Sequence, residues 1–142
     1  MFTLEHQDGN IEYKFEKGGF AVIDSKLYLS IQSKALEEDG FPDCYYFAID
    51  GFPIKTSLES SKIEIATNPD DEPPNVYVYT TFHACEVEAI IHLEVISEKE
   101  IEVSLQVISE DVNYYNEKAK PNPFKGSVKL NEKNLGEMWI PS

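Results

Sequence analysis

Hydrophobic and polar residues alternate along most of the chain, which is the pattern of β-strands with one buried face. In IEYKFE (residues 11–16), Ile11, Tyr13 and Phe15 share one face and charged residues occupy the other. GFAVID (19–24) and LYLSIQS (27–33) continue the pattern. KGG and DSK separate these runs and indicate turns, because glycine accepts positive φ and Asp and Ser favour turns. The N-terminal part is therefore predicted to be a meander of three strands.

The rest of the chain adds more strands and little helix. CYYFAID (44–50) is apolar on both faces, which is typical of a central, covered strand. NPDDEPPN (68–75) is predicted to be a surface loop, because proline fits neither a ladder nor a helix. We expect a single domain over residues 1–142, mostly β, with at most one or two short helices: an antiparallel β-sandwich or partly open barrel of about nine or ten strands. A β-sheet with one helix packed on it is the nearest alternative. The other alternating runs are 62–67, 76–82, 83–96, 100–109 and 124–130.

The longest predicted hairpin joins FHACEVEAIIHLEV (82–95) to EIEVSLQVIS (100–109). Its two apolar faces match only when the numbers of opposed residues sum to an even number. This parity requires a loop with an odd number of residues, most often three, or a β-bulge. The other face of the hairpin is predicted to be acidic; it carries Glu86, Glu88, His92, Glu94 and Glu102.

The acidity of the chain limits the classes of molecule that it is expected to bind. There are 26 acidic residues against 12 basic ones, a net charge of −14, and the basic residues are all lysine. From Glu59 to Glu117 there are 14 acids and two lysines. Such a surface repels phosphate backbones and anionic membranes, and it attracts basic proteins. We therefore expect a basic protein partner and neither nucleic acid nor membrane; acidity that serves only solubility is the alternative.

No pattern of catalytic, metal-binding or cofactor-binding residues is evident. His83 and Cys85 share a strand face, but the rest of that face is apolar, so Cys85 is expected to pack as a small hydrophobe. Glu86 and Glu88 disfavour a thiolate there. Acids on an open sheet face are not the cleft that a glycosidase needs, and the acidic loops lack EF-hand spacing. Nucleotide and hydrolase motifs are also missing, so we predict a non-enzyme without a metal or cofactor.

Two cysteines, Cys44 and Cys85, are too few for a disulfide scaffold. The N-terminus shows no signal-peptide pattern, and no apolar run approaches the ~20 residues of a membrane span. The expected location is therefore cytoplasmic. Tyr77 and Tyr79 share a strand face and suit either recognition or packing. Trp139 is expected to pin the C-terminal end onto the body rather than to bind a ligand.

A small, acidic, Tyr-rich, mostly β domain of this kind resembles the immunity proteins of bacterial polymorphic toxin systems. LYLSIQSKALEEDGFPDCYYFAID (27–50) has the strand, acidic loop and strand of some of them. The resemblance implies a toxin inhibitor that neutralises a basic toxin or nuclease. Alternatives are a small-ligand-binding barrel or sandwich, a phage or secretion-system structural subunit, or an enzyme with an unrecognised acidic site. The candidate partner-binding residues are Asp70, Asp71, Glu72, Tyr77, Tyr79, Glu86, Glu88, His92, Glu94 and Glu102.

Overall fold

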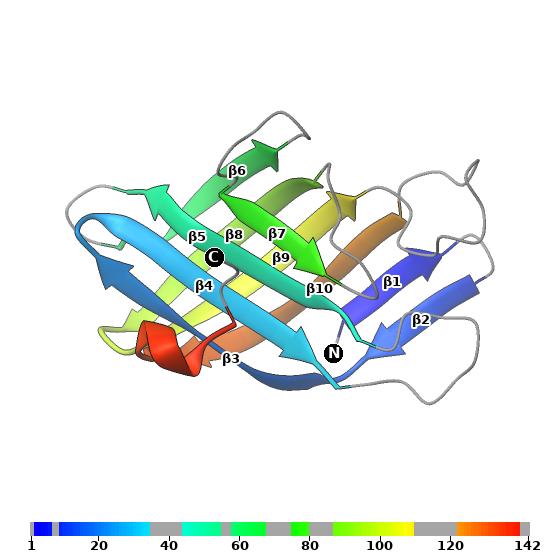
Figure 1. Ribbon diagram of the computed structural model, residues 1–142, viewed down its shortest axis with the longest axis horizontal. Helices are drawn as coiled ribbons and strands as arrows, with labels where there is room; N and C mark the ends of the chain where they lie inside the picture. Colours follow the sequence, from blue (N-terminus) through cyan, green and yellow to red (C-terminus); the bar gives the residue numbers. More distant parts are fainter. Residues whose placement is uncertain are drawn as a thin grey trace.

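The computed structural model describes residues 2–6, 9–34, 44–54, 58–67, 75–79, 87–109 and 122–139. These residues form ten β-strands and one short 3-10 helix, η1 (Figure 1). No helix within these ranges is long and apolar enough to cross a membrane. The strands are β1 (Phe2–His6), β2 (Gly9–Tyr13), β3 (Phe15–Ile23), β4 (Lys26–Ser33), β5 (Tyr46–Pro53), β6 (Ser61–Thr67), β7 (Val76–Tyr79), β8 (Val87–Ser97), β9 (Glu100–Ser109) and β10 (Asn122–Asn131), and η1 spans Leu135–Glu137.

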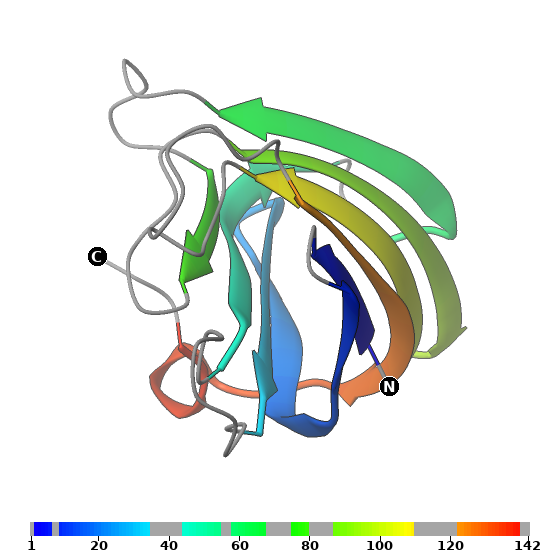
Figure 2. The ribbon, with the colours of Figure 1, turned by 90° about the vertical axis from the view of Figure 1, so that its right-hand side faces the viewer.

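The strands form two sheets that pack face to face. Sheet A has six strands in the order β2-β1-β10-β9-β8-β6, and sheet B has four in the order β3-β4-β5-β7. The paired strands of both sheets run antiparallel. Figure 2 shows sheet A curving around the flatter sheet B. The expected antiparallel β-sandwich with nine or ten strands is confirmed.

The alternation seen in the sequence separates the core from the exterior. The buried residues of β8 and β9 face each other across the ladder in the pairs Ala89–Val107, Ile91–Leu105 and Leu93–Val103. Sheet B contributes the inner residues of β4 and β5. Burying such side chains contributes roughly 1.5–3 kcal/mol each, which is the main term that holds the sheets together.

Four aromatic rings stack through the end of the core where β1, β2 and β10 lie. Tyr45 lies on Phe124 with ring centroids 3.7 Å apart and an interplanar angle of 6°. Phe2 stacks on Phe124 at 5.2 Å, and Tyr13 meets its edge at 6.0 Å. Because Tyr45 precedes β5 of sheet B and the other rings belong to sheet A, this stack joins the two sheets.

The turn predicted at KGG is wrong, because Lys17, Gly18 and Gly19 lie inside β3. These glycines allow close approach of other chain segments rather than a reversal of the chain. A Cβ at Gly18 would collide with the carbonyl oxygen of Ser30 in β4, and one at Gly19 would collide with the side chain of Lys133. The break between strands falls instead at Lys14, where the chain passes from sheet A to sheet B. The predicted meander of three strands is therefore wrong, because β2 pairs with β1 and not with β3. The turn predicted at DSK is confirmed: Asp24 and Ser25 have φ of 53° and 60°, as a type I′ turn requires.

The hairpin of β8 and β9 has the predicted parity. Val87 faces Ser109 and Val95 faces Ile101, so opposed residue numbers sum to an even value along most of the ladder. The register shifts between Val95 and Ser97, where β8 has a β-bulge. The bulge allows the hairpin to close with a two-residue turn at Glu98 and Lys99. Of the two solutions that the sequence left open, an odd loop or a bulge, the structure has the bulge.

Candidate functional site

The outer face of the β8–β9 hairpin carries the acidic residues predicted from the sequence. Because Val87, Ala89, Ile91 and Leu93 point into the core, the alternate side chains of β8 point away from it. Glu88, His92 and Glu94 are exposed. Glu102 of β9 is half-buried on the same face. We call Glu88, His92, Glu94 and Glu102 the acidic hairpin face.

Two of these carboxylates lie directly opposite each other. In the β8–β9 register Glu94 pairs with Glu102, and Lys129 of β10 lies on the other side of Glu102. Opposed residues of an antiparallel pair have Cβ atoms roughly 4.5–5.5 Å apart, so the two negative charges repel. His92 lies one row away and faces Ser104 of β9 and Lys62 of β6. The pairing therefore gathers negative charge near the bulged end of the hairpin.

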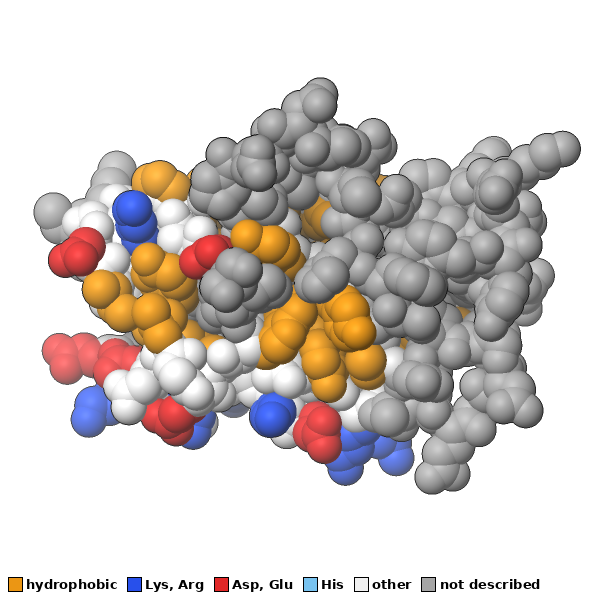
Figure 3. Space-filling model, in the orientation of Figure 1, with side chains coloured by type: hydrophobic (Ala, Val, Ile, Leu, Met, Phe, Trp, Pro, Cys, Tyr) orange, Lys and Arg blue, Asp and Glu red, His pale blue; other side chains and the backbone are white. Residues whose placement is uncertain are grey.

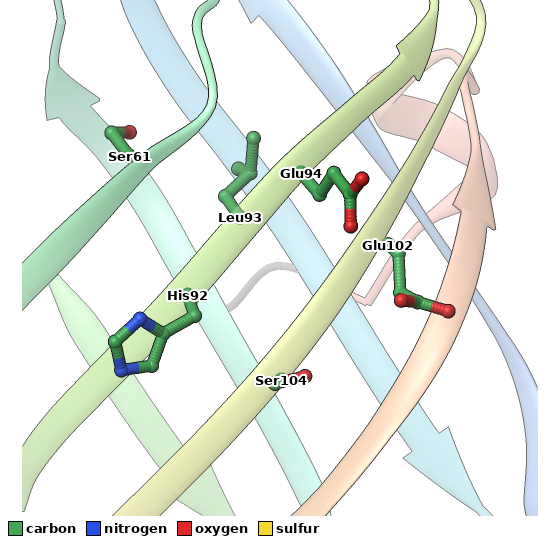
Figure 4. A pocket seen from close by; sticks show the side chains of 6 residues that line it. All are labelled: Ser61, His92, Leu93, Glu94, Glu102 and Ser104. Atoms are coloured by element: carbon green, nitrogen blue, oxygen red, sulfur yellow. The ribbon is translucent and has the colours of Figure 1, made fainter.

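A shallow depression of about 290 Å³ lies at the same place. Figure 4 shows its side chains: the Glu94 carboxylate lies between β8 and β9, and that of Glu102 extends toward β10. The His92 ring projects on the β6 side of β8. The depression is lined by Ser61, His92, Leu93, Glu94, Glu102 and Ser104. Since a water molecule occupies about 30 Å³ in the liquid, the space is sufficient for the end of a lysine or arginine side chain.

Ion pairs on this outer surface of sheet A lie beside the hairpin acids rather than on them. Lys62 Nζ is 2.9 Å from a carboxylate oxygen of Glu64 within β6, and Lys125 Nζ is 3.4 Å from Glu5. Among the described residues, no ion pair involves Glu88, Glu94 or Glu102. The acidic hairpin face thus carries carboxylates that no ion pair among the described residues neutralises, although Lys129 lies next to Glu102 in the register.

The structure does not bring the predicted tyrosines to this face. Val76 and Val78 of β7 are buried, so Tyr77 and Tyr79 point away from the core on the outer surface of sheet B. Tyr77 and Tyr79 therefore do not form one surface with the acidic hairpin face, because strands of two different sheets carry them on opposite exteriors. Four other candidates, Asp70, Asp71, Glu72 and Glu86, lie outside the described residues, as do His83 and Cys85.

Tyr79 instead belongs to an aromatic cluster with Tyr46 and Trp139. The Trp139 ring lies 5.4 Å from that of Tyr46 and 6.1 Å from that of Tyr79, measured between centroids. The expectation that Trp139 pins the C-terminal end onto the body is confirmed by these contacts. Burial, and then the nearby Cys44, raise the pKa of the Tyr46 hydroxyl. Burial and the neighbouring Asp50 carboxylate raise the pKa of Tyr77.

Some residues of the depression were not predicted from the sequence. Ser104 lies on the outward positions of β9, so its alternation with Val103 and Leu105 would have sufficed to include it. Ser61 reaches the site because β6 pairs with β8, with Ser61 opposite Leu93. No local signal in the sequence specifies that pairing. Within the described ranges, no three His, Cys, Asp or Glu side chains lie where they would hold a metal ion.

Comparison with known proteins gives no match: no protein-family model, no curated protein and no solved structure is similar to this chain.

Proposed function

We propose that this protein is a non-catalytic protein-binding domain that neutralises a basic partner through the acidic hairpin face. The observation that carries the proposal is the cross-strand pair of Glu94 and Glu102, exposed and half-buried respectively, without a described cation between them. Like charges that lie directly opposite destabilise a sheet. A cationic side chain placed between the two carboxylates would turn this repulsion into attraction.

The depression supports the same assignment. It lies between the rows of His92 and Glu94 and is open to solvent, so a lysine or arginine of a partner can enter with its charged end first. The hydroxyls of Ser61 and Ser104 are suited to accept hydrogen bonds from an ammonium or guanidinium group. Hydrogen bonds between charged groups are shorter and stronger than neutral ones, which favours a cationic anchor here.

The overall charge of the chain fits a fast, salt-sensitive encounter. A net charge of −14 steers a basic protein toward the domain before contact. A partner that binds nucleic acid through a basic cleft would lose that cleft to the acidic hairpin face. This is the mode of action of an immunity or toxin-inhibitor protein, and it needs no catalytic group on this chain.

The test is affinity capture of the partner from the native source with two charge-reversed variants. The first, Glu88→Lys/Glu94→Lys, changes the acidic hairpin face. The second, Glu12→Lys/Glu16→Lys, makes the same change of charge at exposed positions on β2 and β3, which pair with neither strand of the hairpin. A stoichiometric basic partner is expected on the unmodified chain and on the second variant. It should be lost on the first variant, and on washing at about 0.5 M salt, where the Debye length is a few ångströms.

Equal loss of the partner on both variants would show that net charge, not this face, governs binding. Retention on the first variant with loss on the second would place the partner elsewhere than on the acidic hairpin face. Either result would overturn the proposal. Circular dichroism of both variants must match that of the unmodified chain, so that loss of binding is not loss of fold.

A further inference from the structure

On the outer face of sheet B, a row of small residues is shielded from solvent. Gly19 of β3, Ser30 of β4 and Ala48 of β5 are neighbours across the ladder, and Tyr77 of β7 continues the row. Leu29, Ile31, Phe47 and Ile49 point into the core, so Ser30 and Ala48 point outward, yet both are 0% exposed. This face is therefore a shallow trough whose floor is covered by other parts of the chain.

The segment that crosses this trough is the C-terminal strap, residues 132–139. Its backbone begins beside β3, where the Lys133 N–H donates to the Phe20 carbonyl at 2.9 Å. In Figure 1, η1 lies next to β3. Met138 is 8% exposed, and Trp139 contacts Tyr46 and Tyr79. Figure 3 shows the hydrophobic side chains that gather on this face.

The strap buries few of its own side chains. Residues 132–137 are exposed, and only Met138 and Trp139 at its end are buried or half-buried. A segment with so few buried contacts opens at a free energy well below that of global unfolding. The same face holds an unsatisfied polar group: the Ser30 hydroxyl is fully buried and has no hydrogen-bond partner among the described residues. An orphaned buried hydroxyl costs about 1–3 kcal/mol, so a group that bonds to it would bind this face more favourably.

We propose that the outer face of sheet B is a docking surface for an extended peptide segment of a partner, which the C-terminal strap occupies as an internal ligand. The strap itself indicates the chemistry of that segment. It buries an apolar side chain, Met138, and places the indole of the next residue, Trp139, against Tyr46 and Tyr79. A partner segment with an apolar–aromatic pair and a backbone group that reaches the Ser30 hydroxyl would fit the same trough better.

This surface is independent of the acidic hairpin face. The two lie on opposite exteriors of the sandwich, so a variant of one does not touch the other. The strap competes from within the same molecule, where the effective concentration of a short tethered segment is on the order of millimolar. A peptide added to the intact chain must overcome that concentration, whereas a chain whose strap has lost its anchor is free to bind the peptide directly.

The sole tryptophan makes the test specific. Full-length Trp139→Ala contains no tryptophan, so when a synthetic peptide of residues 131–142 is added, all indole fluorescence comes from the peptide. We expect a saturable blue shift as the indole enters the trough. Adding Tyr79→Ala to this chain should weaken binding about tenfold, since aromatic pairs contribute about 0.5–1.5 kcal/mol beyond their area. The matched control, Tyr28→Ala on the same face, should change the affinity by less than about threefold.

A second measurement uses the unmodified chain. A peptide with phenylalanine in place of the tryptophan should displace the strap and shift the emission of Trp139 to longer wavelength. Its apparent affinity should be at least about tenfold weaker than for Trp139→Ala, because the strap competes. Should Trp139→Ala unfold, Trp139→Phe gives an equally silent background.

Absence of a saturable shift in both measurements, at up to about 1 mM peptide, would overturn the proposal. So would concentration-dependent dimerisation of the unmodified chain that Trp139→Ala abolishes, because the occupant would then be the strap of a second copy. Loss of the basic partner in the capture experiment above leaves these outcomes unchanged, so the two proposals fail separately.

Discussion

Replacing Glu94 by lysine reverses one charge of the pair that Glu94 forms with Glu102 across β8 and β9. Glu94 is exposed and Glu102 is half-buried, and Lys129 faces Glu102 from β10. The variant therefore places the Glu102 carboxylate between two lysines instead of between a lysine and a second carboxylate. We predict that Glu94→Lys makes the isolated domain more stable while it weakens binding of a basic partner.

The magnitude follows from the register. Cross-strand charge pairs contribute roughly 0.2–1 kcal/mol, favourable for opposite charges and unfavourable for like charges. Coulomb's law in water gives about 0.7 kcal/mol for unit charges about 6 Å apart, and reversal of the sign counts this twice before screening. A net gain of about 0.5–1 kcal/mol at low salt is therefore expected. For a chain of this size, that raises Tm by roughly 2–3 °C.

The matched control is Glu88→Lys, which makes the same change of charge on the same strand and face. Glu88 lies opposite Ala66 on one side and Ile108 on the other, so it has no like charge directly across the ladder. Both variants relieve the general self-repulsion of an acidic protein. The difference between them isolates the pair of Glu94 with Glu102.

The assay is equilibrium urea unfolding of both variants at about 20 mM and about 500 mM salt, where the Debye length falls from roughly 20 Å to a few ångströms. The advantage of Glu94→Lys over Glu88→Lys should shrink at high salt. If the two variants are equally stable at low salt, or their difference is independent of salt, the carboxylates do not repel and the argument from the register is refuted.

Three further changes test the fold. Gly18→Ala should cost about 2–3 kcal/mol in urea unfolding, because its Cβ meets the backbone of β4, whereas Gly136→Ala, which has open space, should cost under about 0.5 kcal/mol. Ser25→Gly should stabilise by about 0.5–1 kcal/mol, because φ of 60° strains a residue with a Cβ; a decrease in stability would contradict this. Burial is the main cause that raises the pKa of Tyr45, and the nearby Tyr13 raises it further. Ser109 lowers this pKa by a smaller amount, although the Tyr45 hydroxyl makes no hydrogen bond of normal geometry. The contribution of Tyr45 to stability is therefore complete below its ordinary pKa of 10, and it is lost as the pH rises above that value, by up to about 1.4 kcal/mol per pH unit. Tyr45→Phe should remove this part of the alkaline loss of stability. Urea unfolding between about pH 9 and pH 11 measures it.

Alternation along the chain was sufficient to predict which residues of β8 and β9 are buried, and the parity of their hairpin, whereas in β4 the outward-facing Ser30 and Gln32 are buried as well. Both depend on neighbours in sequence or on a single short connection. The glycines of KGG show where this reasoning fails. Their small size is needed because Ser30 and Lys133 approach them, and both come from other elements. A glycine required by a distant neighbour has the same local sequence signal as one required by a turn.

The order of the strands was not predictable for the same reason. β1 pairs with β10, and β6 pairs with β8 although β7 lies between them in sequence. These pairings decide the candidate site: they bring Ser61 to the depression and send Tyr77 and Tyr79 to the other exterior. The acidic residues of the hairpin, by contrast, were found from sequence because one local hairpin carries Glu88, Glu94 and Glu102.

Three arrangements in the described structure are locally unfavourable. One lies in the core and two lie on the exterior, where a partner can reach them. The Tyr45 hydroxyl is buried in the core, where no partner molecule can reach it. The pair of Glu94 with Glu102 and the covered hydroxyl of Ser30 lie instead on the two exteriors, one on each sheet. Proteins tolerate departures from good local chemistry where function requires them. A cation would relieve the first exterior defect and a peptide backbone the second, so each defect specifies a different kind of partner. The back-to-back arrangement of the sheets would allow both partners to bind the same molecule at once.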